Sequence, residues 1–246
     1  MTAPPSTDTP VAIITGGGSG IGLGIARALL REKVSVCLMG RTLSRLEEAR
    51  QTLIAEGAGT EDQVMLCAGD LSAEGDAERA VDDTMQRWGR IDIVINNAGR
   101  ADLVNLDQES RQHCRDVFET NVIGPMMLVK AAWPHFITTG RGTVINISSK
   151  AVFDPFPGFA AYAASKSALD SLTRTMINEA PQEMDFFACS IAPGAVETGM
   201  LRSMFDTSML PTSATLHPDD LGEAIAQHAL RQHPDANGQV LLKEQS

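Results

Sequence analysis

Tyrosine is nearly missing from this chain of 246 residues, in which Tyr162 is the single example. Aromatic residues together make up 4% of the sequence, so the core must be mainly aliphatic. No apolar run approaches the ~18 residues of a membrane-spanning helix, and the polar, Pro-rich segment 1–10 lacks the apolar centre of a signal peptide. We therefore expect segment 1–10 to be a flexible tail, and the protein to be cytoplasmic and not bound to membranes.

Basic residues are also scarce. The 20 lysines and arginines are outnumbered by 31 aspartates and glutamates, which gives a net charge of −11. Nucleic acids and anionic membrane surfaces bind basic protein faces, so neither is an expected partner. An anionic ligand would need a local device, such as the N-terminus of a helix, to hold it.

The four cysteines form no CxxC pair, and the five histidines show no metal-ligand spacing. Cys37, Cys67 and Cys189 fall in apolar runs, which predicts buried thiols. The sequence thus indicates no metal site, and a reducing compartment such as the cytosol fits it.

What the chain does contain is a repeated alternation of short apolar strands with longer amphipathic helical patterns. This alternation predicts an α/β fold, a doubly wound parallel sheet that helices cover on both faces in three layers. No linker interrupts the pattern, so residues 11–246 are expected to form one domain with a loop-rich segment at 193–217. The expected strands are 11–15, 34–39, 64–67, 91–95, 143–148, 186–191 and 239–242, and the expected helices are 21–32, 43–56, 74–88, 106–138 with a break at Gly124-Pro125, 160–179 and 218–230.

Glycines and a serine join the first strand to the first helix, in Thr15-Gly16-Gly17-Gly18-Ser19-Gly20-Ile21-Gly22. The missing side chains leave room for a pyrophosphate near the backbone, and the helix N-terminus supplies N–H donors. A merely tight strand–helix turn is the alternative interpretation.

Other polar residues follow the later strands, where ligands bind in doubly wound sheets. Asn96-Asn97-Ala98-Gly99 closes the fourth strand and suits either a backbone against a cofactor or an ordinary turn. Asp70 could accept a hydrogen bond from an adenine or cap the next helix, for which Ser72 is the better candidate. Asn121 lies among apolar residues of a helical stretch, where its side chain needs an internal partner.

Tyr162 precedes Lys166 by four residues, which on a helix places the phenol and the ammonium on one face. A neighbouring cation favours the phenolate and is expected to lower the Tyr162 pKa from its usual value of about 10. Such a phenol can exchange a proton with a carbonyl or an alcohol. A helix with one aromatic residue and a surface lysine is the simpler alternative.

In order and spacing, these motifs resemble the short-chain dehydrogenase/reductase family from Thr15 to about Val240. The motifs that carry the resemblance are the glycine-rich turn, the Asn96–Gly99 segment, the set Asn121, Ser149, Tyr162 and Lys166, and the loop Pro193-Gly194-Ala195-Val196-Glu197-Thr198. A fainter similarity, around Glu179–Met200, is to sepiapterin and benzil reductases.

The resemblance implies a Rossmann fold and a nicotinamide-dependent oxidoreductase, expected to form a homodimer or homotetramer. It implies that Tyr162 exchanges the proton, Ser149 hydrogen-bonds the substrate oxygen, Lys166 binds the nicotinamide ribose and lowers the Tyr162 pKa, and Asn121 holds a water in a proton relay. The implied cofactor contacts are Gly16, Gly18, Ser19, Gly20, Ile21, Asp70, Leu71, Asn97, Ala98, Gly99, Pro193, Val196 and Thr198, together with Tyr162 and Lys166.

The cofactor is expected to be NADP(H) rather than NAD(H). Relatives that use NAD place an acidic residue at the position of Gly40, where it takes the ribose hydroxyls. Gly40 cannot do so, and Arg41 offers a fork of donors suited to a 2′-phosphate. A solvated Arg41 without a ligand is the alternative.

Apolar residues after Ser149 and after Thr198 predict a pocket for a neutral, largely apolar ketone or the matching secondary alcohol, because burying an unpaired charge there would be costly. Packing on a neighbouring subunit is the alternative. Segment 199–211 is long enough to act as a lid. The expected walls are Ala151, Val152, Phe153, Phe156, Phe159, Met200, Leu201, Met204, Phe205, Met209 and Leu210.

Two other functions stay open. The first is an NAD-linked alcohol or sugar dehydrogenase. The second is a non-catalytic dinucleotide sensor on the same fold, although sensors commonly lose the Tyr or the Lys that this chain keeps.

Overall fold

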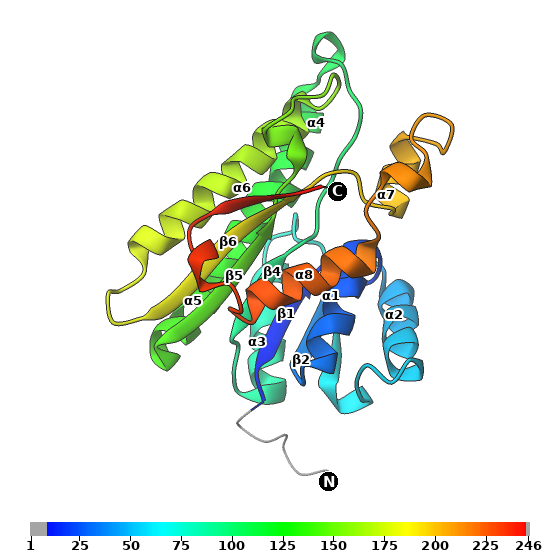
Figure 1. Ribbon diagram of the computed structural model, residues 1–246. Coiled ribbons are helices and arrows are strands. Elements are labelled where there is room, and N and C mark those ends of the chain that lie inside the picture. Colours follow the sequence, from blue (N-terminus) through cyan, green and yellow to red (C-terminus); the bar gives the residue numbers. More distant parts are fainter. Residues whose placement is uncertain (1–8, 245–246) are drawn as a thin grey trace.

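Residues 9–244 are described by the computed structural model, and their strands form one parallel sheet in the order β3-β2-β1-β4-β5-β6-β7 (Figure 1). Strand order reverses between β1 and β4, and ligands bind at such a switch point. The expected tail falls almost wholly outside the described residues. The strands are β1 Val11–Thr15, β2 Ser35–Gly40, β3 Val64–Ala68, β4 Ile93–Asn96, β5 Arg141–Ile147, β6 Asp185–Pro193 and β7 Val240–Lys243.

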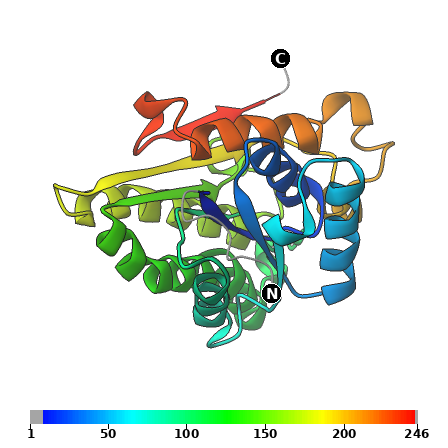
Figure 2. The ribbon, with the colours of Figure 1, turned by 90° about the horizontal axis from the view of Figure 1, so that it is seen from below.

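Helices cover both faces of this sheet, with α1 and α8 on one side and α5 on the other in Figure 2. Side chains alternate along a strand, so Ile14 packs toward α1, α2 and α8 while Ile13 packs toward α3, α5 and α6. The three-layer prediction is therefore confirmed. The helices are α1 Gly20–Arg31, α2 Leu43–Ala55, α3 Asp76–Trp88, α4 Arg111–Phe118, α5 Gly124–Thr139, α6 Ala160–Glu179, α7 Gly199–Met204 and α8 Pro218–Ala229.

Every expected strand is present, with ends displaced by at most about two residues. Val11–Thr15 is buried along its whole length, as expected for a strand covered on both faces. Cys37, Cys67 and Cys189 are buried and unpaired, as predicted. None of the described helices is long and apolar enough to cross a membrane.

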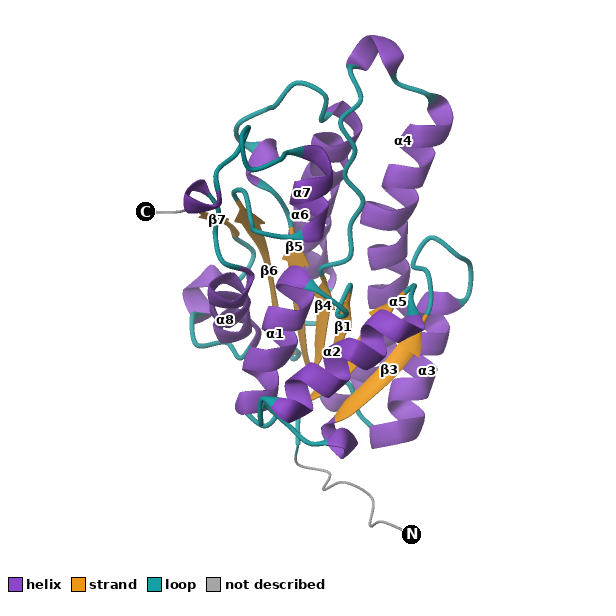
Figure 3. Ribbon diagram, turned by 90° about the vertical axis from the view of Figure 1, so that its right-hand side faces the viewer, coloured by secondary structure: helices purple, strands orange, loops and turns teal. Residues whose placement is uncertain are grey.

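The long helical stretch expected at 106–138 is divided. A short 3-10 turn at Leu106–Gln108 precedes α4, and a π-helical turn, Glu119–Ile123, separates α4 from α5. Figure 3 shows α4 and α5 along the same side of the molecule. The break lies one turn before the expected position, because Pro125 donates no N–H and its ring crowds the carbonyl of Asn121, which widens the turn that carries Asn121.

Segment 193–217 contains a short helix that was expected to be loop. The Thr198 hydroxyl caps α7 by accepting a hydrogen bond from Leu201 N at 3.2 Å. An isolated β-bridge then pairs Leu216, just before α8, with Val196, just after β6. The segment is thus anchored at both ends.

Candidate active site

A cavity of about 1110 Å³ lies at the carboxyl ends of the strands. It brings together the glycine-rich turn, the ends of β2 to β6 and the 193–217 segment, as the sequence motifs predicted. Gly18 and Asn121 are the two candidate residues that do not line it. The candidates that do are Gly16, Ser19, Gly20, Ile21, Arg41, Asp70, Leu71, Asn97, Ala98, Gly99, Ser149, Tyr162, Lys166, Pro193, Val196 and Thr198.

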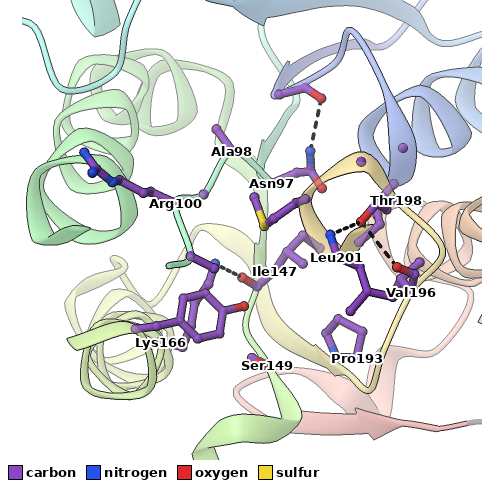
Figure 4. Close-up of a pocket in the computed structure, with 18 of the residues that line it drawn as sticks. Asn97, Ala98, Arg100, Ile147, Ser149, Lys166, Pro193, Val196, Thr198 and Leu201 are labelled. Atoms are coloured by element: carbon purple, nitrogen blue, oxygen red, sulfur yellow. Dashed lines mark hydrogen bonds between the residues drawn. The ribbon is translucent and has the colours of Figure 1, made fainter. Parts of the chain in front are cut away.

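The glycine-rich turn is fastened to the end of β4. The Thr15 hydroxyl accepts hydrogen bonds from the backbone N–H groups of Asn97 and Ala98, at 3.0 and 2.9 Å. In return, Asn97 Nδ2 donates to Thr15 O at 2.8 Å (Figure 4). Gly16 has a φ of +66°, and a Cβ there would lie 2.8 Å from Asn97 Nδ2, so this position requires glycine.

Sequence reasoning missed the part that Thr15 plays, since a threonine that ends an apolar strand carries no distinctive signal. Gly18 is not among the residues that line the cavity. A Cβ on Gly18 would lie 3.2 Å from Leu46 Cδ2, so this glycine lets α2 pack closely and does not face the cavity.

Two arginines stand at the end of the cavity formed by β2 and the start of α2. Arg41 and Arg45 both line it and are exposed, and the side chain of neither forms an ion pair or hydrogen bond with another described residue. Gly40 leaves the adjoining space free of a carboxylate. Arg45 was not among the sequence candidates; it lies in the first turn of α2, while Arg41 precedes the helix.

Asp70 does not cap a helix. Its Oδ1 accepts hydrogen bonds from the backbone N and the hydroxyl of Ser72, at 3.0 and 2.7 Å. The residue before α3 is Gly75, in a left-handed conformation, so Ser72 is not the cap either. The cap interpretation of both residues is wrong, because the chain makes an extra turn between β3 and α3. Asp70 and the buried Leu71 instead border the cavity.

Asn121 is fully buried on the π-helical turn, and it has the internal partners that the sequence called for. Its Oδ1 accepts from Arg100 N at 2.7 Å, while Nδ2 donates to Arg100 O and Ser165 Oγ, both at 2.9 Å. These bonds hold the segment after β4 against α6. The side chain is therefore engaged with protein groups and is not directed into the cavity.

Lys166 lies at the cavity floor with 3% of its surface exposed. Its ammonium donates to Ile147 O at 2.7 Å and lies 5.8 Å from the centre of the Tyr162 ring (Figure 4). Burial lowers the pKa of Lys166 to about 8, against the effect of the nearby Asp170. The spacing of four residues does place both groups on one helix face, as predicted.

The expected lowering of the Tyr162 pKa is wrong for the chain alone. Burial raises the pKa of Tyr162 above its usual value, and the neighbouring Ser149 hydroxyl only partly opposes this. Lys166 does not oppose the effect of burial on this pKa, and its ammonium donates a hydrogen bond to the Ile147 carbonyl. The phenol is thus protonated at neutral pH, which is the form needed to donate a proton.

Aromatic rings close the substrate end of the cavity. Phe159 lies 5.1 Å from the Tyr162 ring centre and 5.7 Å from Phe156, and both phenylalanines contact Phe205 next to α7. These contacts connect the segment after Ser149 to the 199–211 segment. The predicted apolar walls are confirmed for Ala151, Phe156, Phe159, Met200, Leu201, Met204, Phe205, Met209 and Leu210. Val152 and Phe153, at the end of the 3-10 turn that Ser149 caps, do not line the cavity.

Arg202 holds the 199–211 segment in place. Its guanidinium pairs with Glu197 and donates to the carbonyls of Phe205 and Leu210, at 3.3 and 2.7 Å. The Arg202 charge lowers the pKa of Glu197 to about 2, and the Thr215 hydroxyl acts in the same direction. Arg202 is therefore occupied within the protein.

Lys150, at the same end, pairs with Glu244 and lies 3.6 Å from Asp154. Arg100, which also lines the cavity, pairs with Asp102 and Asp116, at 2.8 and 3.1 Å. Cations near the substrate end are thus balanced by carboxylates, whereas Arg41 and Arg45 at the other end are not.

A family model described as short chain dehydrogenase matches residues 10–208, well over half of the chain. The protein belongs to the short-chain dehydrogenase/reductase family. It is therefore an NAD(P)-dependent oxidoreductase that acts on CH–OH and C=O groups of small molecules, on a Rossmann-type fold.

Two curated relatives show the range of this family around the protein. A putative ketoacyl reductase of the granaticin polyketide synthase from Streptomyces violaceoruber is 31% identical, over 96% of this chain and 94% of its own. The 2-(R)-hydroxypropyl-CoM dehydrogenase of Xanthobacter autotrophicus is 32% identical, over 80% of this chain and 78% of its own.

Solved structures of family members have the same fold. The 3-ketoacyl-(acyl-carrier-protein) reductase from Brucella melitensis, complexed with NADH, has a TM-score of 0.86 and 28% identity, and the match covers 97% of this chain and 98% of that one. A 7α-hydroxysteroid dehydrogenase, complexed with NADH and 7-oxo glycochenodeoxycholic acid, has a TM-score of 0.87 and 25% identity, and the match covers 99% of this chain and 97% of that one.

Proposed function

We propose that this family member is an NADP(H)-dependent oxidoreductase that transfers a hydride between the nicotinamide and a neutral, largely apolar ketone or secondary alcohol. One observation supports the whole proposal. The cavity has unpaired arginines at one end, apolar rings at the other, and Tyr162, Ser149 and Lys166 between them.

The chain's own residues fit a nicotinamide dinucleotide. Gly16 and Gly20 have φ values of +66° and +53°, and they keep the backbone beside the cavity free of side chains. The first turn of α1 carries no acidic residue, so its N–H groups and positive dipole end are available to a pyrophosphate. Asp70, Leu71 and the Asn97–Gly99 segment would hold the adenosine. Pro193, Val196 and Thr198 would hold the nicotinamide carboxamide.

When bound, the cofactor supplies or accepts the hydride. In the reduction direction, the protonated Tyr162 donates its proton to the carbonyl oxygen as negative charge develops there. Ser149 donates a hydrogen bond to the same oxygen and fixes its position. The Lys166 ammonium would hold the ribose of the cofactor, and it stabilises negative charge on Tyr162 once the proton has left. In the oxidation direction these transfers are reversed.

The charges at the ribose end support NADP(H). A 2′-phosphate placed there would meet Arg41 and Arg45, each free of a carboxylate partner, and no acidic side chain at Gly40 would repel it. The alternative, an NAD-linked alcohol or sugar dehydrogenase, is favoured by the two structural neighbours that were solved with NADH.

The substrate class follows from the other end of the cavity. Lys150, Arg100 and Arg202 are already paired with carboxylates, so a negatively charged substrate would have to displace one of these carboxylates. The flexible side chains of Met200, Met204 and Met209 suit several apolar shapes.

Steady-state kinetics with both cofactors and a carbonyl panel test the proposal. We expect kcat/KM to be higher with NADPH than with NADH, and higher for neutral aryl and alkyl ketones than for keto acids, phosphosugars or CoA esters. A preference for NADH would favour the NAD-linked alternative. Tight dinucleotide binding without turnover of any carbonyl would instead indicate a sensor.

Two properties of the whole protein belong to the same proposal. A cytoplasmic location is supported by the four unpaired cysteines. A homodimer or homotetramer is supported by Ile123, Met126 and Ile137, which expose 42%, 41% and 51% of their surface along one helical segment. Cell fractionation and analytical ultracentrifugation test these two points.

A further inference from the structure

Asp170 is a carboxylate buried directly behind the candidate active site. It lies one helical turn after Lys166 on α6, and each of these side chains exposes only 3% of its surface. Its Oδ1 has no hydrogen-bond partner among the described residues. Acidic residues are almost never buried to this extent unless paired, so this position calls for an explanation.

The surroundings of Asp170 are polar and lead to the cavity floor. Ser148, which lines the cavity, is 2% exposed, and its hydroxyl also has no partner within the described part of the chain. It follows Ile147, whose carbonyl accepts the hydrogen bond from Lys166 Nζ at 2.7 Å. On the other side, Ser190 faces Asp170 and bonds Thr173 at 2.8 Å. Asp170 therefore adjoins the backbone that positions Lys166.

The charges around this pair are few. Burial lowers the pKa of Lys166, and Asp170 is the one described charged group whose charge opposes that effect. Burial likewise raises the pKa of Asp170, while the hydroxyls of Ser148 and Ser190 and the charges of Arg174 and Lys166 oppose it. The other groups around Lys166, which include Ile147 and Gly99, carry no charge, and the titratable Tyr162 on the same helix is protonated at neutral pH.

We propose that Asp170 is a positioning residue, whose buried carboxylate keeps the Lys166 side chain charged and directed at the Ile147 carbonyl. It does not touch substrate or cofactor and acts only through Lys166. The inference rests on the proposed function in one respect, that Lys166 serves the dinucleotide and Tyr162.

The test compares wild-type protein with Asp170→Asn, which removes the charge and keeps the shape. Dinucleotide affinity and ketone kcat/KM are measured from pH 6 to pH 10. If Lys166 loses the one opposite charge that acts on it among the described residues, it deprotonates at lower pH. The pH at which affinity and kcat/KM fall on the alkaline side should then decrease by roughly one unit. Should Asp170→Asn be too unstable to purify, Asp170→Ser is a smaller neutral replacement with the same expected shift.

Thr173→Val is the matched control. Thr173 is fully buried three residues further along α6 and bonds Asn146 and Ser190, so this change removes buried hydrogen bonds but no charge. Thr173→Val should lower Tm without changing the pH at which affinity and kcat/KM fall on the alkaline side. The proposal is overturned if the neutral Asp170 variants keep the wild-type pH profile, or if Thr173→Val shifts it as much as they do.

The affinity measurement separates this inference from the proposed function. If no carbonyl is reduced by wild-type protein, the proposed reaction fails, yet the pH dependence of dinucleotide binding still decides the role of Asp170.

Discussion

Removing the Arg41 guanidinium should impair the use of NADPH far more than the use of NADH. A hydrogen bond between a charged donor and a charged acceptor contributes about 1.5–3 kcal/mol, and the exposure of Arg41 favours the lower end of that range. Arg41→Ala should therefore lower kcat/KM for NADPH by roughly 10- to 30-fold, since 1.4 kcal/mol corresponds to a factor of ten. Without a 2′-phosphate to bind, NADH should lose less than about threefold.

Arg45 provides an internal comparison. It lines the same end of the cavity from the first turn of α2. Arg45→Ala should therefore lower kcat/KM for NADPH by about threefold to tenfold. Gly40→Asp should reverse the preference, because a carboxylate there repels the phosphate and can bind ribose hydroxyls. A Cβ at Gly40 would lie 3.3 Å from the tip of Leu46, a flexible side chain that can shift slightly.

The assay is initial-rate kinetics with one ketone and both cofactors, at low and at high salt. The NADPH advantage should shrink as salt screens the phosphate contacts. If Arg41→Ala lowers kcat/KM equally for NADPH and NADH, Arg41 stabilises the fold of the site and does not bind the phosphate. An unchanged NADPH value would show that Arg41 is only a solvated surface residue.

Three further outcomes are expected. The rate of ketone reduction should stay constant through neutral pH, because burial keeps Tyr162 protonated. It should decline as pH rises through about 8, where Lys166 loses its proton. A rate that does not change from pH 6 to 10 would contradict both assignments. Arg202→Leu removes the contacts of Arg202 with Glu197 and with the 199–211 segment. KM for bulky ketones should therefore rise roughly fivefold, with little change in Tm. An unchanged KM would show that the segment does not shape the pocket. His228 is 5% exposed and burial lowers its pKa to about 4, so the unfolded chain, with a histidine pKa of about 6.5, takes up the proton first. Stability should thus fall by about 2 kcal/mol between pH 7 and pH 4.5, and urea denaturation of His228→Leu should show a clearly smaller fall.

The fold could be predicted from the sequence because its signals are local. Each strand is a short apolar run bounded by turn residues, and each helix has an apolar face, so strand positions were correct to about two residues. The site residues at strand ends followed from the same pattern, since parallel strands bring their carboxyl ends to one edge.

The parts that could not be predicted depend on tertiary packing. The π-helical turn at Asn121 arises where Pro125 meets a helix already held against α6, which no local pattern reveals. The direction of the Tyr162 pKa depends on how deeply the phenol is buried and where the Lys166 ammonium points. Val152 and Phe153 were assigned to the pocket because the sequence does not show on which side of a short turn a side chain lies.

Replacement of Tyr162 with Phe is the most direct measurement of the proposed chemistry. The change removes the proton donor and keeps the ring, together with its contact to Phe159. NADPH affinity should persist, while ketone reduction at pH 7 falls by roughly two to four orders of magnitude. A variant that binds NADPH normally and keeps more than about a tenth of the wild-type rate would contradict the assignment of Tyr162 as the general acid.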